Sequence, residues 1–108
     1  RDVTIAAKVE AGIPKGSTVM ICEDTDHTYD TTLAILNLYS KYVSKGCLFV
    51  VEDTCMTEYP EVFPGVISGP KEAAAQFLTT EEGKNFEKII EYEAMVYTNN
   101  RSGYLKRR

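Results

Sequence analysis

The sequence lacks several features that would assign it to a familiar class of protein. Its 108 residues include three cysteines with no CxxC spacing, so neither a disulfide framework nor a zinc site is predicted, and a reducing environment is expected. No apolar run approaches the roughly 18 residues that a membrane-spanning helix needs, and no charged-then-apolar leader is present. We therefore expect a soluble, cytoplasmic protein with no membrane partner.

An excess of basic residues is also missing. Lysine and arginine number 12 against 16 aspartates and glutamates, which gives a formal net charge of -4. Proteins that bind nucleic acid neutralise phosphates with lysine and arginine, so nucleic acid is not an expected partner. The basic residues at 105–108 (LKRR) are predicted to form a solvated tail.

Two apolar segments of strand length dominate the first half of the chain, at residues 17–22 (STVMIC) and 47–54 (CLFVVEDT). Nearly continuous apolar runs are typical of strands that are buried on both faces. Between them, residues 28–46 have helical spacing of apolar side chains, with Thr28 as a candidate N-cap and Gly46 as the terminator. Strand, helix and strand in this order predict a parallel βαβ unit and an α/β fold.

The remaining segments are predicted from spacing and from turn residues. A short helical stripe at residues 3–11 precedes the βαβ unit, and residues 55–68 are rich in proline and glycine, which predicts an irregular functional loop. A helix is predicted over 68–81. Residues 85–90 and 93–98 predict two further strands, and their close spacing favours an antiparallel hairpin.

Acidic residues follow both predicted parallel strands. Asp24 and Asp26 come after the first strand, and Glu52 and Asp53 end the second. Parallel neighbours end at the same edge of a sheet, and two like charges about 4 Å apart cost about 4 kcal/mol at an effective dielectric near 20. The carboxylates must therefore retain protons, bind a cation or splay into solvent. Carboxylates with water favour magnesium, manganese or calcium over zinc.

The chain's one histidine, His27, lies three residues after Asp24. Beside a metal ion, an imidazole is well suited to take a proton from a hydroxyl group. Without a metal, the same residue would be an exposed or hydrogen-bonded bystander. Thr28 and Asp30 are better suited to capping the helix, and Cys55 is a weak candidate for a nucleophile because no second histidine is present to activate it.

Four motifs together resemble one known family. They are D-x-D-H at 24–27, V-E-D-T at 51–54, the Gly-Pro helix start at 69–70 and G-Y-L-K-R at 103–107. Over nearly all of its length the chain resembles the C-terminal half of the cephalosporin hydroxylase family, a group of Rossmann-like proteins related to S-adenosylmethionine-dependent O-methyltransferases.

The resemblance implies metal-dependent methyl transfer from S-adenosylmethionine to a hydroxyl of a small molecule, such as a sugar or a natural product. The spacing is similar to that of magnesium-dependent catechol-type methyltransferases. It implies that Asp24, Glu52 and Asp53 hold Mg²⁺ or Mn²⁺, with Asp26 as an alternative to Asp24, and that His27 is the general base.

One departure from the family concerns the cofactor. The family's glycine-rich loop and its ribose-binding acidic residue have no counterpart in the chain, so its cofactor-binding residues are not assigned. We expect residues 1–108 to form a single partial domain, namely the catalytic and metal-binding half of the sheet, without the N-terminal cofactor-binding half. Strand 18–22 would then be central and would pair with a strand of that half or, in a homo-oligomer, with another chain.

Two other functions are compatible with the residues. An aspartate-rich turn after a buried strand also suits metal-dependent phosphoryl transfer with an aspartate nucleophile, although residues 51–54 supply acids where a lysine and a hydroxyl residue are expected. The chain could also be a non-catalytic remnant of the fold. Binding of S-adenosylmethionine separates the methyltransferase from both alternatives.

Overall fold

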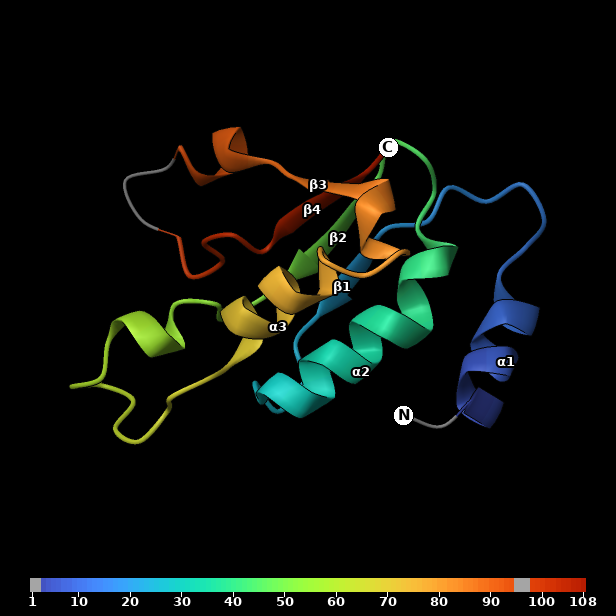
Figure 1. The fold of residues 1–108 in the computed structure, drawn as a ribbon. Helices are drawn as coiled ribbons and strands as arrows, with labels where there is room; N and C mark the ends of the chain where they lie inside the picture. The colour runs from blue at the N-terminus through green and yellow to red at the C-terminus, as the bar shows by residue number, and fades with distance from the viewer. Residues whose placement is uncertain (1–2, 95–97) are drawn as a thin grey trace.

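The chain forms a mixed four-stranded sheet with two helices packed on one face (Figure 1). The computed structural model describes residues 3–94 and 98–108. In chain order the strands are β1 (Ile21–Glu23), β2 (Leu48–Val51), β3 (Phe86–Lys88) and β4 (Tyr104–Arg107). Their order in the sheet is β1-β2-β4-β3. β1 and β2 are parallel, whereas β4 is antiparallel to both β2 and β3, so the predicted α/β class and the parallel βαβ unit are confirmed.

The helices begin near the predicted residues. They are α1 (Val3–Gly12), α2 (Tyr29–Tyr39) and α3 (Pro70–Phe77). Thr28 is the N-cap of α2, as predicted, because its Oγ1 accepts a hydrogen bond from Thr31 N at 3.3 Å. At the start of α3 the Glu72 carboxylate accepts from Gly69 N at 2.8 Å. No helix among the described residues is long and apolar enough to cross a membrane.

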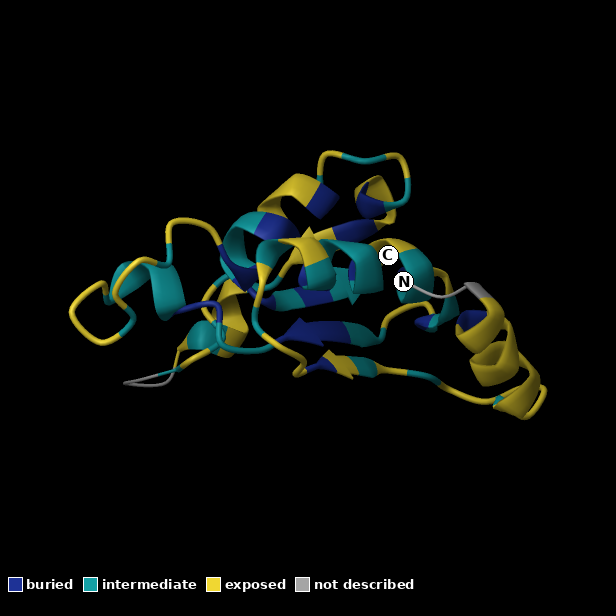
Figure 2. Cartoon of the chain, turned by 90° about the horizontal axis from the view of Figure 1, so that it is seen from below, coloured by how far each residue is buried: buried dark blue, intermediate teal, exposed yellow. Residues whose placement is uncertain are grey.

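The hydrophobic core lies between the sheet and helices α2 and α3. Leu36, Phe49, Phe77 and Leu105 are its largest fully buried apolar side chains. Figure 2 shows the buried residues concentrated where helices face strands, and α1 largely exposed at one side.

The first strand is shorter and more exposed than predicted. Residues 17–20 lie outside the ladder, and Val19 N donates instead to Ser44 Oγ at 2.8 Å. The side chains of β1 alternate between the faces of the sheet, so Glu23 is buried while Cys22 is exposed. Next to the strand, Met20 is 60% exposed. The prediction that this strand is buried on both faces is therefore wrong for the described residues, whereas β2 is largely buried.

The prediction of a solvated basic tail at residues 105–108 is wrong. These residues contribute to β4, which lies between β2 and β3 in the sheet. Leu105 is fully buried, and Arg107 Nη1 donates to Ser40 O and to Glu82 Oε1, both at 2.9 Å. One strand can therefore contain both a buried apolar side chain and long basic side chains, because the basic side chains cover apolar surface with their stems and keep their charged ends at polar groups.

The predicted hairpin between residues 85–90 and 93–98 is also wrong. β3 pairs with β4 instead, in the register Phe86 with Arg107. Residues Ile90–Glu93 form a single 3₁₀ turn. Residues 95–97 of the predicted second strand lie outside the described residues.

Gly103 makes a close backbone contact at the start of β4. A Cβ atom at this position would lie 2.1 Å from Val51 O and 3.1 Å from Asn100 O. Gly103 O also accepts the Val51 N–H at 2.8 Å, so neither strand can move aside without losing that bond. We expect Gly103→Ala to lower the free energy of unfolding by about 3 kcal/mol, the upper end for overpacking, as measured by urea denaturation.

Gly12→Ala is the matched control, because a Cβ at Gly12 would meet no atom within 4 Å. This variant should change stability by less than about 1 kcal/mol. Equal losses in the two variants would contradict the close contact between Gly103 and β2.

Candidate metal and active site

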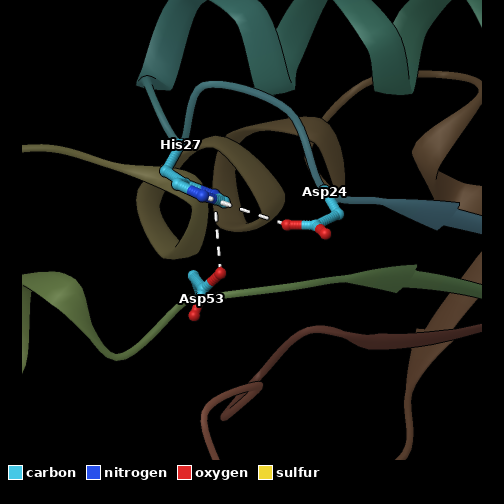
Figure 3. Close-up of side chains that lie close together, drawn as sticks. All are labelled: Asp24, His27 and Asp53. Atoms are coloured by element: carbon cyan, nitrogen blue, oxygen red, sulfur yellow. Dashed lines mark ion pairs between the residues drawn. The ribbon is translucent and has the colours of Figure 1, made fainter.

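The carboxyl ends of β1 and β2 bring three polar side chains together. Glu23 is in register with Val51, so the chain leaves both strands at one edge of the sheet. Asp24 follows β1, Asp53 lies just beyond β2, and His27 sits on the turn before α2. Figure 3 shows these three side chains pointing toward one another.

The three side chains form a compact cluster, here called the Asp-His-Asp cluster (Asp24, His27 and Asp53). His27 Nε2 lies 3.9 Å from Asp24 Oδ1, and His27 Nδ1 lies 3.6 Å from Asp53 Oδ2. One ligand atom from each residue lies within 4.8 Å of the others. The side chains of His27 and Asp53 are 31% and 34% exposed, and that of Asp24 is 61% exposed. The cluster is therefore half-buried on one side and open to solvent on the other.

His27 Nδ1 is buried and has no hydrogen-bond partner among the described residues. Its 3.6 Å separation from Asp53 Oδ2 is longer than a hydrogen bond. A buried polar atom without a partner costs about 1–3 kcal/mol, and a ligand hydroxyl would remove that cost. Two carboxylates, with water, form a donor set that suits a divalent cation such as Mg²⁺ or Mn²⁺, and the imidazole beside them can accept a proton. The residues therefore fit the predicted metal.

Two members of the cluster have left-handed backbone conformations. The φ angle is 57° at His27 and 51° at Asp53. Aspartate and histidine adopt this region more often than most residues, but it still costs of order 1 kcal/mol or more per residue. Asp53 is fixed there by a 3.1 Å hydrogen bond from its N–H to Asn100 Oδ1. Strained backbone at both positions is typical of residues held for function.

Asp26 does not join the cluster, although it was considered as an alternative metal ligand. Its Oδ1 accepts from Thr28 N at 3.2 Å and from Thr28 Oγ1 at 2.9 Å, and its Oδ2 accepts from Thr31 Oγ1 at 3.1 Å. These bonds hold its carboxylate at the N-terminus of α2, where negative charge is favourable. Asp30 lies in the first turn of the same helix.

Glu52, the other predicted metal ligand, is directed away from the cluster. Its Oε1 accepts from Cys22 Sγ at 2.7 Å, and Cys22 lies on the exposed face of β1. The pKa of Cys22 is raised to about 12, first by partial burial of the thiol and then by the hydrogen bond to Glu52 and the nearby carboxylates. The thiol is therefore neutral at pH 7. The role of Glu52 as a metal ligand stays a prediction, and it would require the carboxylate to leave Cys22.

Glu23, the last residue of β1, is buried. Its side chain is 2% exposed and accepts hydrogen bonds from Thr25 N at 3.2 Å, from Thr25 Oγ1 and from Thr32 Oγ1 at 3.2 Å. It thereby joins the turn that carries Asp24 and His27 to helix α2. Neither a buried position nor this structural role for Glu23 was predicted from the sequence.

A cavity of about 300 Å³ adjoins the cluster through Asp53. Sequence reasoning missed it because its walls come from two distant segments. Its lining residues are Asp53, Cys55, Tyr59, Val62, Phe63 and Asn99. Burial, and then the negative charge of Asp53, raise the pKa of Cys55, so this thiol is a neutral, small apolar group and a poor nucleophile.

Glu58 fixes the loop that forms one wall of this cavity. Lys71 Nζ in α3 donates to Glu58 Oε1 at 2.5 Å, and Arg101 Nη1 donates to Glu58 Oε2 at 3.4 Å. The pKa of Glu58 is lowered by the hydrogen bond from Lys71 and by the charge of Lys71, with a smaller effect of Arg101. Burial opposes this change. Two segments far apart in sequence are therefore joined through one carboxylate.

The pH dependence of stability should reveal this ion pair. A lowered folded-state pKa stabilises the protein above the unfolded pKa, near 4.5, and this contribution disappears as the pH falls through the folded pKa. We expect Glu58→Gln to reduce the free energy of unfolding by about 1 kcal/mol at pH 7, with the difference from the wild type shrinking below pH 4.5 in urea titrations.

Glu81→Gln is the matched control for that measurement. Glu81 pairs with Lys84 on the exposed surface, where ion pairs contribute little. This variant should differ from the wild type by less than about 0.5 kcal/mol at either pH. A pH-independent loss in Glu58→Gln would show that Glu58 acts through packing and not through its charge.

Comparison with known proteins gives the family. A family model described as "Rhamnosyl O-methyltransferase/CmcI" matches residues 1–108. No match was found among curated proteins or among solved structures. Because the match spans the whole chain, this chain belongs to the rhamnosyl O-methyltransferase/CmcI family, as its motifs predicted, and this membership indicates an S-adenosylmethionine-dependent O-methyltransferase.

Proposed function

We propose that the protein transfers a methyl group from S-adenosylmethionine to a hydroxyl group of a small sugar or natural product, with a divalent cation at the Asp-His-Asp cluster. The observation that carries the proposal is this cluster at the carboxyl ends of β1 and β2, with a buried nitrogen on His27 that has no hydrogen-bond partner among the described residues. Family membership supports the methyl donor, and the cluster supports the metal and the base.

Asp24 and Asp53 hold Mg²⁺ or Mn²⁺ in this proposal. A bound divalent ion lowers the pKa of a nearby hydroxyl and so makes its oxygen a better nucleophile. Glu52 serves as a third ligand only if its side chain leaves Cys22. Asp26 is not included, because its carboxylate is held by Thr28 and Thr31.

His27 is the general base. Its imidazole accepts the proton of the acceptor hydroxyl while the oxygen takes the methyl group. The carboxylates of Asp24 and Asp53, at 3.9 Å and 3.6 Å, stabilise the imidazolium that results. The methyl donor supplies a carbon on a positively charged sulfur and leaves as a neutral thioether, so the departing group needs no proton from the protein.

The cofactor contacts are proposed to lie outside these residues. The family's cofactor loop is rich in glycine, whereas the turns after β1 and β2 of this chain carry aspartates. We propose that residues 1–108 are the catalytic half of a Rossmann-like sheet and that an upstream half, or a second chain, pairs with β1. Within the described part of the chain β1 is an edge strand, and unpaired edges favour such association.

The test is transfer of a labelled methyl group from S-adenosylmethionine to a panel of glycosides and phenols, measured with protein that contains the proposed upstream half. Transfer should require Mg²⁺ or Mn²⁺ and should stop when EDTA is added. Transfer that continues in EDTA would remove the metal from the proposal. Phosphate release from a phosphate ester without methyl transfer would instead support the phosphoryl-transfer alternative.

A further inference from the structure

Asp53 lies just past the point where β2 leaves the sheet. β1 ends at Glu23, and the Glu52 N–H donates to Glu23 O at 3.0 Å. The next amide along the chain, that of Asp53, donates to a side chain instead, namely to Oδ1 of Asn100 at 3.1 Å. One asparagine therefore takes over from the sheet at the residue that belongs to both the Asp-His-Asp cluster and the neighbouring cavity.

Asn100 projects from a turn at residues 98–103 whose backbone is tied down on several sides. The Asn100 N–H donates to Thr98 Oγ1 at 3.1 Å, and Asn100 O accepts from Gly103 N at 2.9 Å. Ser102 N donates to Glu93 Oε1 at 2.6 Å. These bonds fix the place from which the Asn100 side chain reaches Asp53.

The bond from Asp53 to Asn100 holds a backbone conformation that the chain does not favour by itself. Among the described residues, the non-glycine residues with positive φ are His27, Asp53 and Ser102. Such conformations persist only where the surrounding contacts enforce them. A change of φ at Asp53 would rotate its Cα–Cβ bond relative to β2, and the carboxylate would leave its position 3.6 Å from His27 Nδ1.

We propose that Asn100 is a positioning residue for Asp53: its side-chain oxygen keeps the Asp53 backbone left-handed and so keeps the carboxylate beside His27. The consequence for metal binding rests on the proposed function, in which Asp53 is a ligand. Residues that only support metal ligands typically contribute 10- to 100-fold to metal affinity. The affinity of the cluster for Mn²⁺ should therefore depend on an asparagine that acts through Asp53.

Hydrogen exchange of the Asp53 N–H tests this inference without any metal. Protein that contains the proposed upstream half is labelled with ¹⁵N-aspartate, and the Asp53 resonance is identified by its loss in Asp53→Asn. Asn100→Ala should speed exchange of this amide by about 10-fold, as expected when one hydrogen bond is lost. Asn100→Asp keeps an oxygen acceptor on a side chain of the same shape, so it should restore the wild-type exchange rate.

Titration with Mn²⁺, followed by electron paramagnetic resonance of the free ion, gives the second readout in the same protein. Asn100→Ala should lower the affinity by about 10- to 100-fold, whereas Asn100→Asp should not lower it.

Asn99→Ala is the matched control for both measurements. The Asn99 side chain accepts only a weak contact from Cys55 Sγ, at 4.0 Å. The hydrogen bonds that Asn99 accepts from Thr54 Oγ1 and Cys55 N go to its backbone carbonyl, which the substitution retains. This variant should change neither the exchange rate of the Asp53 N–H nor the affinity for Mn²⁺.

The outcomes separate this inference from the proposed function. An unchanged exchange rate of the Asp53 N–H in Asn100→Ala would overturn it, as would equal Mn²⁺ affinities in Asn100→Ala and a wild type that binds the ion. Equal effects of Asn99→Ala and Asn100→Ala would show a general loosening of the turn and would also overturn it. A wild type that binds no Mn²⁺ would contradict the proposed metal site, while faster exchange in Asn100→Ala that Asn100→Asp restores would still support the positioning of Asp53 by Asn100.

Discussion

The His27→Asn variant should transfer methyl groups about 10²–10⁴ times more slowly than the wild type, the usual contribution of a positioned general base. Asparagine tolerates the left-handed backbone at this position, so the loss reports on the imidazole and not on the turn. Initial rates with labelled S-adenosylmethionine at saturating substrate give kcat directly. Affinity for Mg²⁺ should remain nearly unchanged.

His27→Ala should show a similar loss of turnover. If either variant instead loses divalent cations, His27 is a metal ligand and its assignment as the base is wrong. His27 lies 3.9 Å from Asp24 and 3.6 Å from Asp53, so it is close enough to act either as a ligand or as a base, and the metal affinity of the variants distinguishes the two roles.

Asp53→Asn should weaken binding of Mg²⁺ or Mn²⁺ by at least about 100-fold, since even residues that only support metal ligands contribute 10- to 100-fold. The substitution keeps the shape of the side chain and tolerates the φ of 51°, and it removes the charge shared by the cluster and the cavity. Calorimetric titration of each cation into the protein gives the affinities.

Asp30→Asn is the control for that titration, because Asp30 lies in the first turn of α2 and outside the cluster. It should retain wild-type affinity. Glu52→Gln tests the third predicted ligand: the family motif implies a strong loss, whereas a carboxylate that stays on Cys22 implies a small one. Equal affinity in Asp53→Asn, Glu52→Gln and the wild type would remove the metal site.

The βαβ unit and the meeting of acidic side chains at its edge were predictable because their signals are local. An apolar run, a capping residue at Thr28 and a second apolar run specify the unit within about thirty residues. Parallel pairing of β1 with β2 then brings Asp24 and Asp53 to one edge without further information. Which carboxylates turn inward was not predictable, because it depends on partners such as Thr28 for Asp26 and Cys22 for Glu52.

The features that were missed depend on contacts between distant parts of the chain. Residues 105–108 look basic and solvated alone, and become a strand only between β2 and β3. The cavity likewise needs Tyr59 and Phe63 on one side and Asn99 on the other. A single sequence gives no signal for such pairings, because each segment is unremarkable by itself.

The central position of β4 has a consequence for the order of folding. β1, α2 and β2 can associate through local contacts. β3, in contrast, has no neighbour in the sheet until β4 has paired with β2. The residues that pair in this step, such as Val50 and Tyr104, lie half the chain apart in sequence. Long-range pairing of this kind is slow relative to helix formation. The same late step brings Asn100 to the Asp53 N–H and Asn99 O to the Thr54 hydroxyl. Partly folded chains would therefore contain the metal-site residues before they could hold them in place, and tight binding of a divalent cation would report that folding is complete.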